Sequence, residues 1–515
     1  VNSVFPIVTG DIDAAFAQAD RVVSLRLHNQ RVIPMMMEPR ASVATWEPGI
    51  QKLTMWASTQ APHILRRYLC DHFKLSDFQV RVIAPEVGGG FGAKITTYPD
   101  DFLVAYAAMQ LGKPVKYLED RSVNFQQTIH GRAQVDYIDA AVKNDGTLIG
   151  LKVKVIGDNG AYIGLNGGGV HNLTALMMPA AYKVQNYSVE VVGVFTNTTP
   201  TDAYRGAGRP EGVYNMERLM DTIAFDLGLD PVEVRRRNFI QPDQYPYQSP
   251  SHLVYDSGNY PACLNGALEK SNYAGFPARQ AAARKAGRYI GIGMANAVEA
   301  TGLGPYESAT VRVATSGRIT IYTGASPQGQ AHKTTLAQIA SDQLGVSFKE
   351  IDVVTSDTAA TALGMGTFAA RTAVNAGNSV HVAAMAVADK AKKIAAGMME
   401  CLEDDLELAD GCVRLKSAPD VKKTLREIAV KAFGMPGFSM AGDISPGLEH
   451  TAHFTPDQSA YSNGAHVAEV EVDIETGEVK ILRFTVVHDC GRVINPMVVD
   501  GQVIGGVAHG VGNAL

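Results

Sequence analysis

Three consecutive glycines, Gly88 to Gly90, constrain this sequence more than any other feature. They end an apolar run that begins at Arg81, and the segment Phe91–Lys94 (Phe-Gly-Ala-Lys) follows them. Consecutive glycines are a poor way to build an ordered core, because each one loses much backbone entropy on folding. They suit a place where bare main chain must approach something closely. The segment therefore predicts a loop that cradles a cofactor, with Phe91 as its packing residue.

Two common phosphate-binding motifs explain this loop poorly. A P-loop needs Gly directly before Lys, and here Ala93 precedes Lys94. A dinucleotide fingerprint fits formally at Gly88, Gly90 and Ala93, but that motif opens a helix. Here the next predicted helix, 99–111, starts several residues after the glycine loop, so the loop does not open it. A dinucleotide-binding fold is therefore disfavoured, and a glycine-rich turn without a ligand stays open at this point.

The composition argues against several classes of protein. The 515 residues are 46% hydrophobic and 19% charged, with a net charge of −6 and no Lys/Arg stripe, which disfavours nucleic acid as a partner. No apolar run approaches the roughly 20 residues of a membrane span. The five cysteines are scattered without a C-x-x-C pair, which disfavours an iron–sulfur or structural zinc site and indicates a reducing compartment such as the cytoplasm.

Sheets and helices mix in both halves of the sequence without strict β-α-β alternation, which favours an α+β fold. An irregular, proline-containing stretch and an Ala/Arg-rich one place a boundary near 275–288. We therefore expect two mixed lobes, 1–280 and 281–515. The clearest later elements are helices over 211–227, 331–344 and 372–401 and a hairpin of strands 465–472 and 480–490.

Six loops share one property, which is a set of amide side chains, arginines or backbone N–H groups near the start of a helix. They are Ser58–Gln60, Gly88–Lys94, Ala203–Pro210, Ser326–His332, Gly364–Thr372 and Asp489–Pro496. Such donors suit a large anionic ligand with oxo or phosphate groups. Clusters of carboxylate, His or Cys side chains are missing from these loops, so a metal held directly by the protein is not expected.

These loops resemble those of the molybdopterin-binding large subunit of the xanthine oxidase family of molybdenum hydroxylases, and the aerobic carbon monoxide dehydrogenase-like branch most of all. The resemblance covers nearly the whole chain, and the motifs follow the family's order. The number of positions between Gln60 and Phe91 in the sequence also agrees with that of the family. The segments that carry it are Gly88–Gly92, Tyr204–Pro210, Gly329–Thr335, Gly366–Arg371 and Asp489–Pro496.

The resemblance implies a cofactor bound between two lobes, close to three residues. Gln60 would donate a hydrogen bond to a ligand of the molybdenum. The main chain of Gly90, Phe91 and Gly92 would lie against the same centre. Arg205 would hold its loop and the pterin side. Gln60, Phe91 and Arg205 are therefore the implied catalytic set.

The other implied cofactor-binding residues lie in the later loops. The resemblance makes Gln330 a ligand of the pterin and places 367–371 and the Asp489 loop along a dinucleotide tail. The implied cofactor is molybdenum–molybdopterin cytosine dinucleotide, whose own dithiolene holds the metal. The implied set in these loops is Gly329, Gln330, His332, Thr367, Phe368, Ala369, Ala370, Arg371, Asp489 and Asn495.

The implied reaction is hydroxylation of a small molecule with oxygen from water. Electrons are expected to pass to 2Fe-2S clusters and FAD on partner subunits, an iron–sulfur small subunit and a FAD-binding medium subunit, in a dimer of heterotrimers. Residues 510–515 have the pattern of the beginning of a helix. In the family, the catalytic Glu lies in a segment that follows this region. We therefore expect a chain truncated at both ends, or one piece of a split subunit, that does not turn over alone.

Two positions narrow the implied substrate. Carbon monoxide oxidisers carry a Cys after the Arg of the Tyr-Arg loop, and here Gly206 follows Arg205. Purine oxidisers carry a Glu directly after the Lys of the glycine loop, and here Ile95 follows Lys94. An aldehyde or an N-heteroaromatic compound remains. A carbon monoxide dehydrogenase and a non-catalytic scaffold stay as alternatives.

Several of these residues also have a plainer interpretation. Arg209 could form a structural ion pair, and Asp489 could cap the loop that follows it. Glu38 fits an ion pair in a turn better than a site carboxylate. The methionines at 35–37 fit packing. His332 could support the site without touching the ligand, or simply be a buried histidine.

Overall fold

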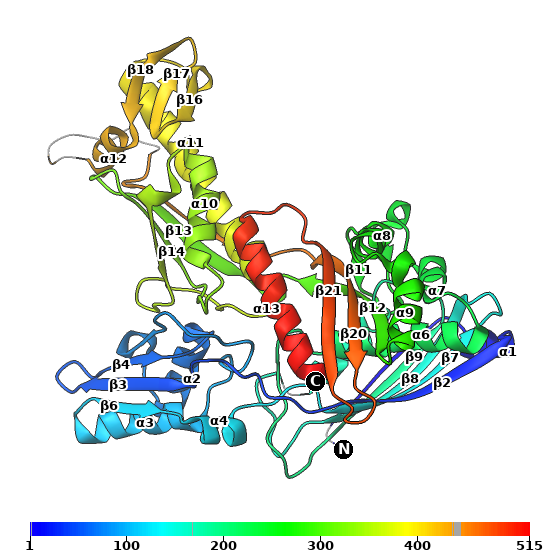
Figure 1. Cartoon of the computed structure of the whole chain (residues 1–515). Coiled ribbons are helices and arrows are strands. Elements are labelled where there is room, and N and C mark those ends of the chain that lie inside the picture. Colours follow the sequence, from blue (N-terminus) through cyan, green and yellow to red (C-terminus); the bar gives the residue numbers. More distant parts are fainter. Residues whose placement is uncertain (2, 167, 435, 437–443) are drawn as a thin grey trace.

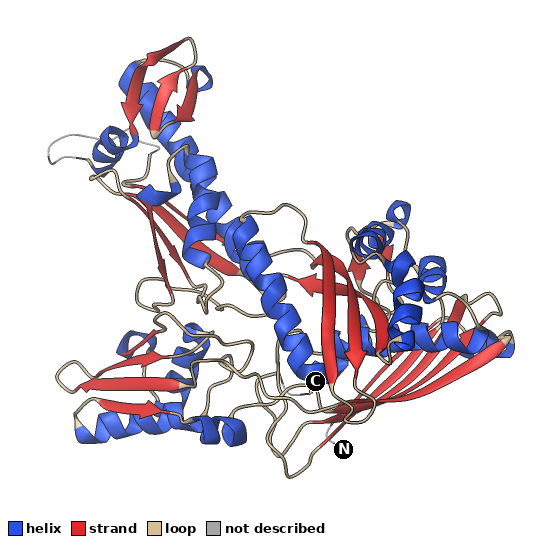
Figure 2. Cartoon of the chain, in the orientation of Figure 1, coloured by secondary structure: helices blue, strands red, loops and turns tan. Residues whose placement is uncertain are grey.

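The computed structural model describes residues 1–515 apart from 2, 167, 435 and 437–443. Three units, each made of sheet and helix, are arranged around the central helix α13 (Pro496–Ala514) (Figure 1). Figure 2 shows that helices and strands are combined in every unit. The expected α+β class is therefore confirmed.

The first unit is a four-stranded sheet in the order β5-β4-β3-β6, with β4 and β5 parallel. Its own core forms where Leu53, Met55 and Val82 pack against helices α2 and α3. Helix α3 ends where the sequence predicts, because Gly112 takes φ +58° there. The elements are β3 (Ala41–Glu47), β4 (Lys52–Ala57), α2 (Pro62–Phe73), β5 (Val80–Ile83), α3 (Pro99–Leu111), β6 (Val115–Leu118) and α4 (Arg121–Gln127).

The second unit is built on a five-stranded sheet in the order β1-β9-β8-β7-β2. Helix α6 starts slightly before the predicted 211, because Pro210 fits the first helical turn and Gly208 precedes it at φ +90°. The elements are β1 (Ser3–Thr9), α1 (Ile12–Ala17), β2 (Arg21–Asn29), β7 (Gln134–Val142), β8 (Leu148–Asp158), α5 (Gly169–Met177), β9 (Tyr187–Val194), α6 (Arg209–Leu227), α7 (Pro231–Asn238), β10 (Tyr247–Gln248), β11 (Val254–Tyr255), α8 (Tyr260–Lys270) and α9 (Phe276–Lys285).

A three-stranded sheet from the later part of the sequence completes this second unit. It consists of β12 (Tyr289–Thr301), β20 (Ala460–Val472) and β21 (Val479–Asp489), with β20 in the middle. The predicted hairpin is thus confirmed. Strands β12 and β20 contact helices α6 and α8. Val298 and Val467 lie in one core with Ile138 and Leu219, so packing crosses the expected division between 1–280 and 281–515.

The third unit is a four-stranded sheet in the order β15-β14-β13-β19. Helices α10 and α11 cover it, and α11 is preceded by a π-helical turn, Thr372–Gly377. The sequence analysis missed the small sheet over 406–424. The elements are β13 (Glu307–Val313), β14 (Ile319–Thr323), α10 (His332–Leu344), β15 (Ile351–Thr355), α11 (Asn378–Met399), β16 (Leu406–Ala409), β17 (Cys412–Leu415), β18 (Ala418–Thr424), α12 (Leu425–Phe433) and β19 (Leu448–Phe454).

Helix α13 corrects the expectation that a helix begins near 510. It begins at Pro496, after Asn495, whose Oδ1 accepts a hydrogen bond from Val498 N at 3.2 Å. Its many glycines hide it from a propensity argument. None of its residues is buried, and Met497 and Ile504 are 78% and 69% exposed. Among the described residues, no helix is long and apolar enough to cross a membrane.

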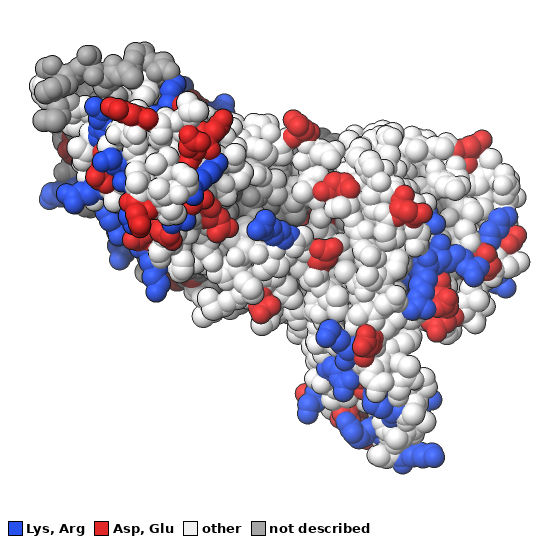
Figure 3. Space-filling view, turned by 90° about the horizontal axis from the view of Figure 1, so that it is seen from above, with Lys and Arg blue, Asp and Glu red and all other residues white. Residues whose placement is uncertain are grey.

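Charged side chains gather mainly toward the protruding ends of the molecule on the face shown in Figure 3. Basic and acidic groups are mixed there, and the middle of this face carries few of either. Mixed charges produce little long-range field of a single sign. This face therefore offers little electrostatic steering to a highly charged polymer.

The joint core of the second unit can be tested with Val467→Asp. Val467 is 1% exposed, so the new carboxylate has no water and no partner, and we expect the free energy of unfolding to fall by roughly 3 kcal/mol or more. Leu482→Asp on the neighbouring strand is the control, because Leu482 is 39% exposed. Urea unfolding measures both variants. Equal losses would contradict the shared core.

Candidate functional site

Five of the six predicted loops are joined by direct contacts. They come from all three units and are brought together by the tertiary structure, not by sequence order. One is Ser58–Gln60, and we name the other four the glycine loop (Gly88–Lys94), the arginine loop (Ala203–Gly208), the glutamine loop (Ser326–Ala331) and the threonine loop (Gly364–Arg371).

The glycine loop packs against the arginine loop, backbone to backbone. Arg205 N donates to Phe91 O at 2.9 Å. A Cβ atom added to Gly92 would lie 1.9 Å from Ala203 O, and Gly92 has φ +106°. Only glycine therefore fits this position. The close approach of two main chains accounts for part of the glycine content that the sequence analysis assigned to a ligand.

Gln60 ties the glycine loop to the threonine loop. Its Oε1 accepts from Gly92 N at 2.9 Å and Lys94 N at 3.2 Å, and its Nε2 donates to Thr367 O at 2.9 Å. Two main-chain hydrogen bonds reinforce this link: Gln60 N donates to Lys94 O at 2.8 Å, and Thr367 N donates to Gln60 O at 2.9 Å. Gln60 is 3% exposed. An amide nitrogen carries two N–H groups, so one of them is left for the ligand role that stays a prediction.

Arg205 lies between the glycine loop and helix α13. Its guanidinium is 5.7 Å from the centre of the Phe91 ring and donates to Gln502 O and Oε1 at 3.0 and 3.2 Å. The His509 ring packs edge-on against Phe91 at 4.5 Å and lies 5.6 Å from the Tyr204 ring. Phe91, Tyr204 and His509 thus form an aromatic cluster beside an arginine.

The sequence analysis missed His509. Burial and the positive charge of Arg205 lower its pKa, and its Nδ1 is buried without a partner among the described residues. The imidazole is therefore neutral near pH 7. Gln502 and His509 stand seven residues apart, which places both on one face of a helix. That spacing is the signal that could have found them.

Two buried arginines hold consecutive carbonyls of the arginine loop. Arg132 donates to Tyr204 O at 3.1 Å and to Arg205 O at 2.9 Å. Arg209 donates to Gly206 O at 3.0 Å. The carbonyls of this loop are thus turned toward the protein interior. The sequence analysis did not single out Arg132, because nothing in its sequence neighbourhood marks this long-range contact.

Two of the plainer interpretations describe what the side chains do here. Arg209 Nε forms an ion pair with Glu299 at 3.3 Å. Glu38 forms an ion pair with Lys94 at 2.8 Å and also accepts from Gly88 N at 2.7 Å. Burial lowers the pKa of Lys94 despite Glu38. Both pairs stabilise loops and leave no free charge for a ligand.

The methionines at 35–37 were expected to pack, and only one of them does. Met36 is fully buried in a small cluster with Phe91, whereas Met35 and Met37 are 53% and 86% exposed. Met36 thus packs against Phe91 and supports the glycine loop.

The glutamine loop joins the site through Ser326. Ser326 N donates to Thr367 Oγ1 and Ser326 Oγ to Thr59 O, both at 3.0 Å. The side chain of Gln330 bonds within its own loop, to Gln328 N at 2.6 Å and Gln328 Oε1 at 2.7 Å. Gln330 is therefore linked to Gln60 through neighbours rather than by direct contact.

The predicted residues at the sixth loop have structural partners. Asp489 Oδ1 accepts from Gly491 N at 2.9 Å, which is the capping contact considered above. Asn495 Nδ2 donates to Gln338 on α10 at 3.0 Å. The loop thereby fixes the start of α13 beside α10. A contact of Asp489 or Asn495 with a cofactor stays a prediction.

Three runs of backbone N–H groups face no acceptor among the described residues. They lie in the glycine, glutamine and threonine loops, at Gly89–Phe91, Gly329–Ala331 and Phe368–Ala370. Phe91, Ala331, Ala369 and Ala370 have φ between +50° and +59°, which L-residues rarely adopt. Consecutive N–H groups in such conformations form concave anion sites, and helix α10 directly follows one of them.

This arrangement suits an anionic cofactor that brings its own metal ligands. Among the described residues, no group of three or more His, Cys, Asp or Glu side chains could hold a metal ion. Models of the molybdopterin cofactor-binding domain match residues 1–239 and 266–515. The chain belongs to the molybdopterin-binding large subunits of the xanthine oxidase family. It therefore binds a molybdopterin cofactor.

Individual relatives agree with the family. The chain is 35% identical to the nicotine 6-hydroxylase large subunit of Paenarthrobacter nicotinovorans, over 98% of this chain and 64% of the relative. It is 34% identical to the carbon monoxide dehydrogenase large chain of Hydrogenophaga pseudoflava, over 100% and 66%. The crystal structure of quinoline 2-oxidoreductase from Pseudomonas putida 86 matches with a TM-score of 0.93 and 34% identity, over 99% and 66%. The chain spans about two thirds of the length of these relatives.

The contact between the glycine and arginine loops predicts the effect of Gly92→Ala. The added Cβ meets Ala203 O and the residue must keep φ +106°, so we expect the free energy of unfolding to fall by roughly 3 kcal/mol. Gly112→Ala is the control, because φ is +58° and no atom lies within 4 Å. It should cost about 1 kcal/mol. Urea unfolding and cofactor content measure both, and equal effects would contradict the close contact.

His332, the first residue of α10, predicts a pH dependence. It is 5% exposed, and burial lowers its pKa to about 4 from an ordinary 6.5. The unfolded chain takes up a proton below pH 6.5 while the folded chain does not, so stability falls as the pH falls from 6.5 toward 4. This group contributes roughly 3 kcal/mol of that loss.

His332→Gln should remove this part of the dependence. Urea unfolding at pH 7, 6 and 5 measures it, with wild type as the reference. An unchanged slope in the variant would show that His332 is not the group that titrates. His171, whose pKa burial also lowers to about 4, contributes equally to both proteins.

Proposed function

We propose that this chain acts in the large subunit of a molybdenum hydroxylase that inserts oxygen from water into an N-heteroaromatic ring. The observation that carries the proposal is that Gln60 and its neighbours join four loops, which contain three runs of N–H groups without an acceptor among the described residues, and that Phe91 in one of these loops belongs to an aromatic cluster. A rigid cradle of donors holds a large cofactor without protein ligands to the metal. The nearby rings then offer a place for a flat substrate.

The proposed cofactor is the cytosine dinucleotide form of molybdopterin. The N–H runs at Gly329–Ala331 and Phe368–Ala370 suit its phosphate oxygens, because short consecutive backbone donors bind anions well. The second N–H of Gln60 and the main chain of Phe91 suit the metal end. When bound, the group supplies the redox-active metal. The chain itself positions it and excludes water around Gln60, which is 3% exposed.

The aromatic cluster favours a ring as the substrate. Phe91 and His509 are partly exposed, and aromatic rings of this kind hold flat molecules by stacking, while Tyr204 is buried beside His509. The names of two relatives, a nicotine hydroxylase and a quinoline oxidoreductase, point to nitrogen heterocycles. An aldehyde is the alternative within the same chemistry.

Carbon monoxide is the second candidate, because the chain is similar to a carbon monoxide dehydrogenase large chain. One position argues against it. Gly206 has φ +102°, and an added Cβ would lie 2.3 Å from Pro210 Cγ. A cysteine for a copper ion would therefore need a different arginine loop. The ring substrate remains the better supported proposal.

The proposed partners are an iron–sulfur small subunit with 2Fe-2S clusters and a FAD-binding medium subunit, in a dimer of heterotrimers in the cytoplasm. Relatives are named as large subunits or as subunits of complexes, which supports partners of some kind. All five cysteines are free, which suits a reducing compartment. Phe484, Met497 and Ile504 are exposed apolar side chains on β21 and α13, which suits cover by another polypeptide.

Analysis of the complex in which the chain occurs tests this proposal. We expect molybdenum by elemental analysis, a cytosine nucleotide after acid hydrolysis, and dye reduction with quinoline or nicotine. The control is the same complex from a host that cannot make molybdopterin, which should reduce no dye. Absence of both metal and nucleotide would refute the cofactor. Reduction with carbon monoxide alone, or with benzaldehyde alone, would transfer the proposal to that substrate.

A further inference from the structure

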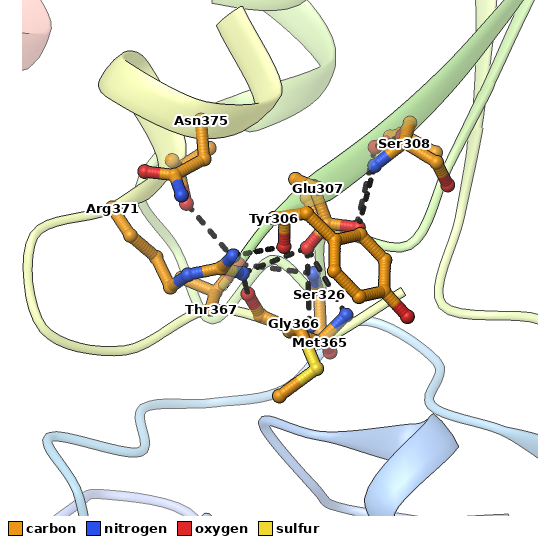
Figure 4. A network of polar contacts seen from close by, with 12 residues as sticks. Tyr306, Glu307, Ser308, Ser326, Met365, Gly366, Thr367, Arg371 and Asn375 are labelled. Atoms are coloured by element: carbon orange, nitrogen blue, oxygen red, sulfur yellow. Dashed lines mark hydrogen bonds and ion pairs between the residues drawn. The ribbon is translucent and has the colours of Figure 1, made fainter. Parts of the chain in front are cut away.

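The threonine loop is held from behind by a buried carboxylate, Glu307, the first residue of β13 (Figure 4). Glu307 has no exposed surface. Its Oε2 accepts from Met365 N at 3.2 Å, Gly366 N at 3.3 Å and Arg371 Nη1 at 2.8 Å. Its Oε1 accepts from Ser308 N at 3.1 Å. One side chain thus contacts both ends of the loop.

Arg371 is the partner of this carboxylate and is 1% exposed. Its Nη1 also donates to Gly366 O at 2.7 Å, its Nε donates to Leu303 O at 3.1 Å, and its Nη2 donates to Tyr306 O. Figure 4 shows the guanidinium of Arg371 turned toward Glu307, Gly366 and Tyr306. The Arg371 side chain is therefore committed to the protein. A contact of Arg371 with the cofactor tail stays a prediction.

The loop needs such an anchor because its backbone is strained. Ala369 and Ala370 both have φ +50°, and two neighbouring L-residues rarely share that conformation. They lie between Gly366 and Arg371, the two points that Glu307 holds. Strain of this kind persists only where the surrounding contacts determine the backbone. The same strained stretch presents the unpaired N–H groups of Phe368–Ala370.

The anchor also reaches the centre of the site. Thr367 O accepts from Gln60 Nε2 at 2.9 Å, and a Cβ on Gly366 would lie 2.2 Å from Gln60 O. A shift of the threonine loop therefore moves the amide of Gln60. Through the threonine loop, Glu307 therefore influences both the N–H groups of Phe368–Ala370 and the amide of Gln60, although it contacts neither of them.

We propose that Glu307 is a positioning residue, which fixes the threonine loop in the shape that binds a phosphate group of the cofactor. This inference rests on the proposed function. It can be tested clearly, because the loss of the Glu307 charge and the release of the threonine loop would change anion binding in opposite directions. Removing a negative charge behind an anion site strengthens anion binding by electrostatics. Releasing the loop weakens anion binding.

Glu307→Gln tests the proposal in the complete complex, since it keeps the size and removes the charge that pairs with Arg371. We expect the cytosine nucleotide content per chain to fall roughly tenfold or more, because hydrogen bonds to charged groups are the strong ones. Hydrogen–deuterium exchange at Met365 and Gly366 should become faster. Exchange in strand β7, which lies in the core of the second unit, is measured in the same sample as the internal reference.

Glu217→Gln is the matched control. Glu217 is also a buried carboxylate paired with an arginine, Arg235 at 2.9 Å, but it lies in the core of the second unit. It should lower the thermal midpoint to a similar extent without changing exchange at 365–366 or the nucleotide content. Loss of nucleotide in both variants would reduce the role of Glu307 to general stability and overturn the proposal.

The remaining outcomes also decide the question. Unchanged or higher nucleotide content in Glu307→Gln, or unchanged exchange at 365–366, would overturn the proposal. Should that variant fail to fold, Arg371→Lys keeps the charge and loses the fork to Gly366 O, and its nucleotide content should fall while its fold persists. A wild-type complex without any nucleotide would refute the proposed function instead, and the exchange data would still test the anchoring of the loop.

Discussion

The hydrogen bonds of Gln60 are the interaction on which the rest of the site depends. Its amide joins Gly92 and Lys94 to Thr367, which is 307 positions away in the sequence. Because the amide is buried, these bonds form without competition from water. The glycine loop then packs on the arginine loop through the bond from Arg205 N to Phe91 O. One small side chain thus sets the relative position of loops from different units.

Three buried arginines shape this site through contacts with the protein itself. Arg132, Arg209 and Arg371 donate to loop carbonyls and are compensated by carboxylates. Their contacts turn carbonyl oxygens inward. Neighbouring backbone N–H groups are left without acceptors, which suits a ligand that is large, anionic and rich in oxygen. Arginines serve such a role well because several fixed N–H groups can hold more than one carbonyl at once.

Local patterns predicted much of the fold and part of the site. Helix α3 and the hairpin of β20 and β21 follow from capping, a C-terminal glycine and alternation, which are local signals. The sheet over 406–424 and the full length of α13 were missed, because short polar strands and a glycine-rich helix have weak propensity. Glu307 and His509 were missed, because their importance lies in contacts with distant loops.

The sequence by itself determined which backbone conformations and which donors are available. Gly92 can approach Ala203 only as a glycine, and the glutamine and arginine side chains can only be amide and guanidinium donors. The tertiary structure decided which of those donors remain free. The Arg371 side chain forms an ion pair with Glu307, whereas the N–H groups of Phe368–Ala370 have no acceptor among the described residues. Pairing depends on groups far apart in the chain, so local pattern cannot reveal it.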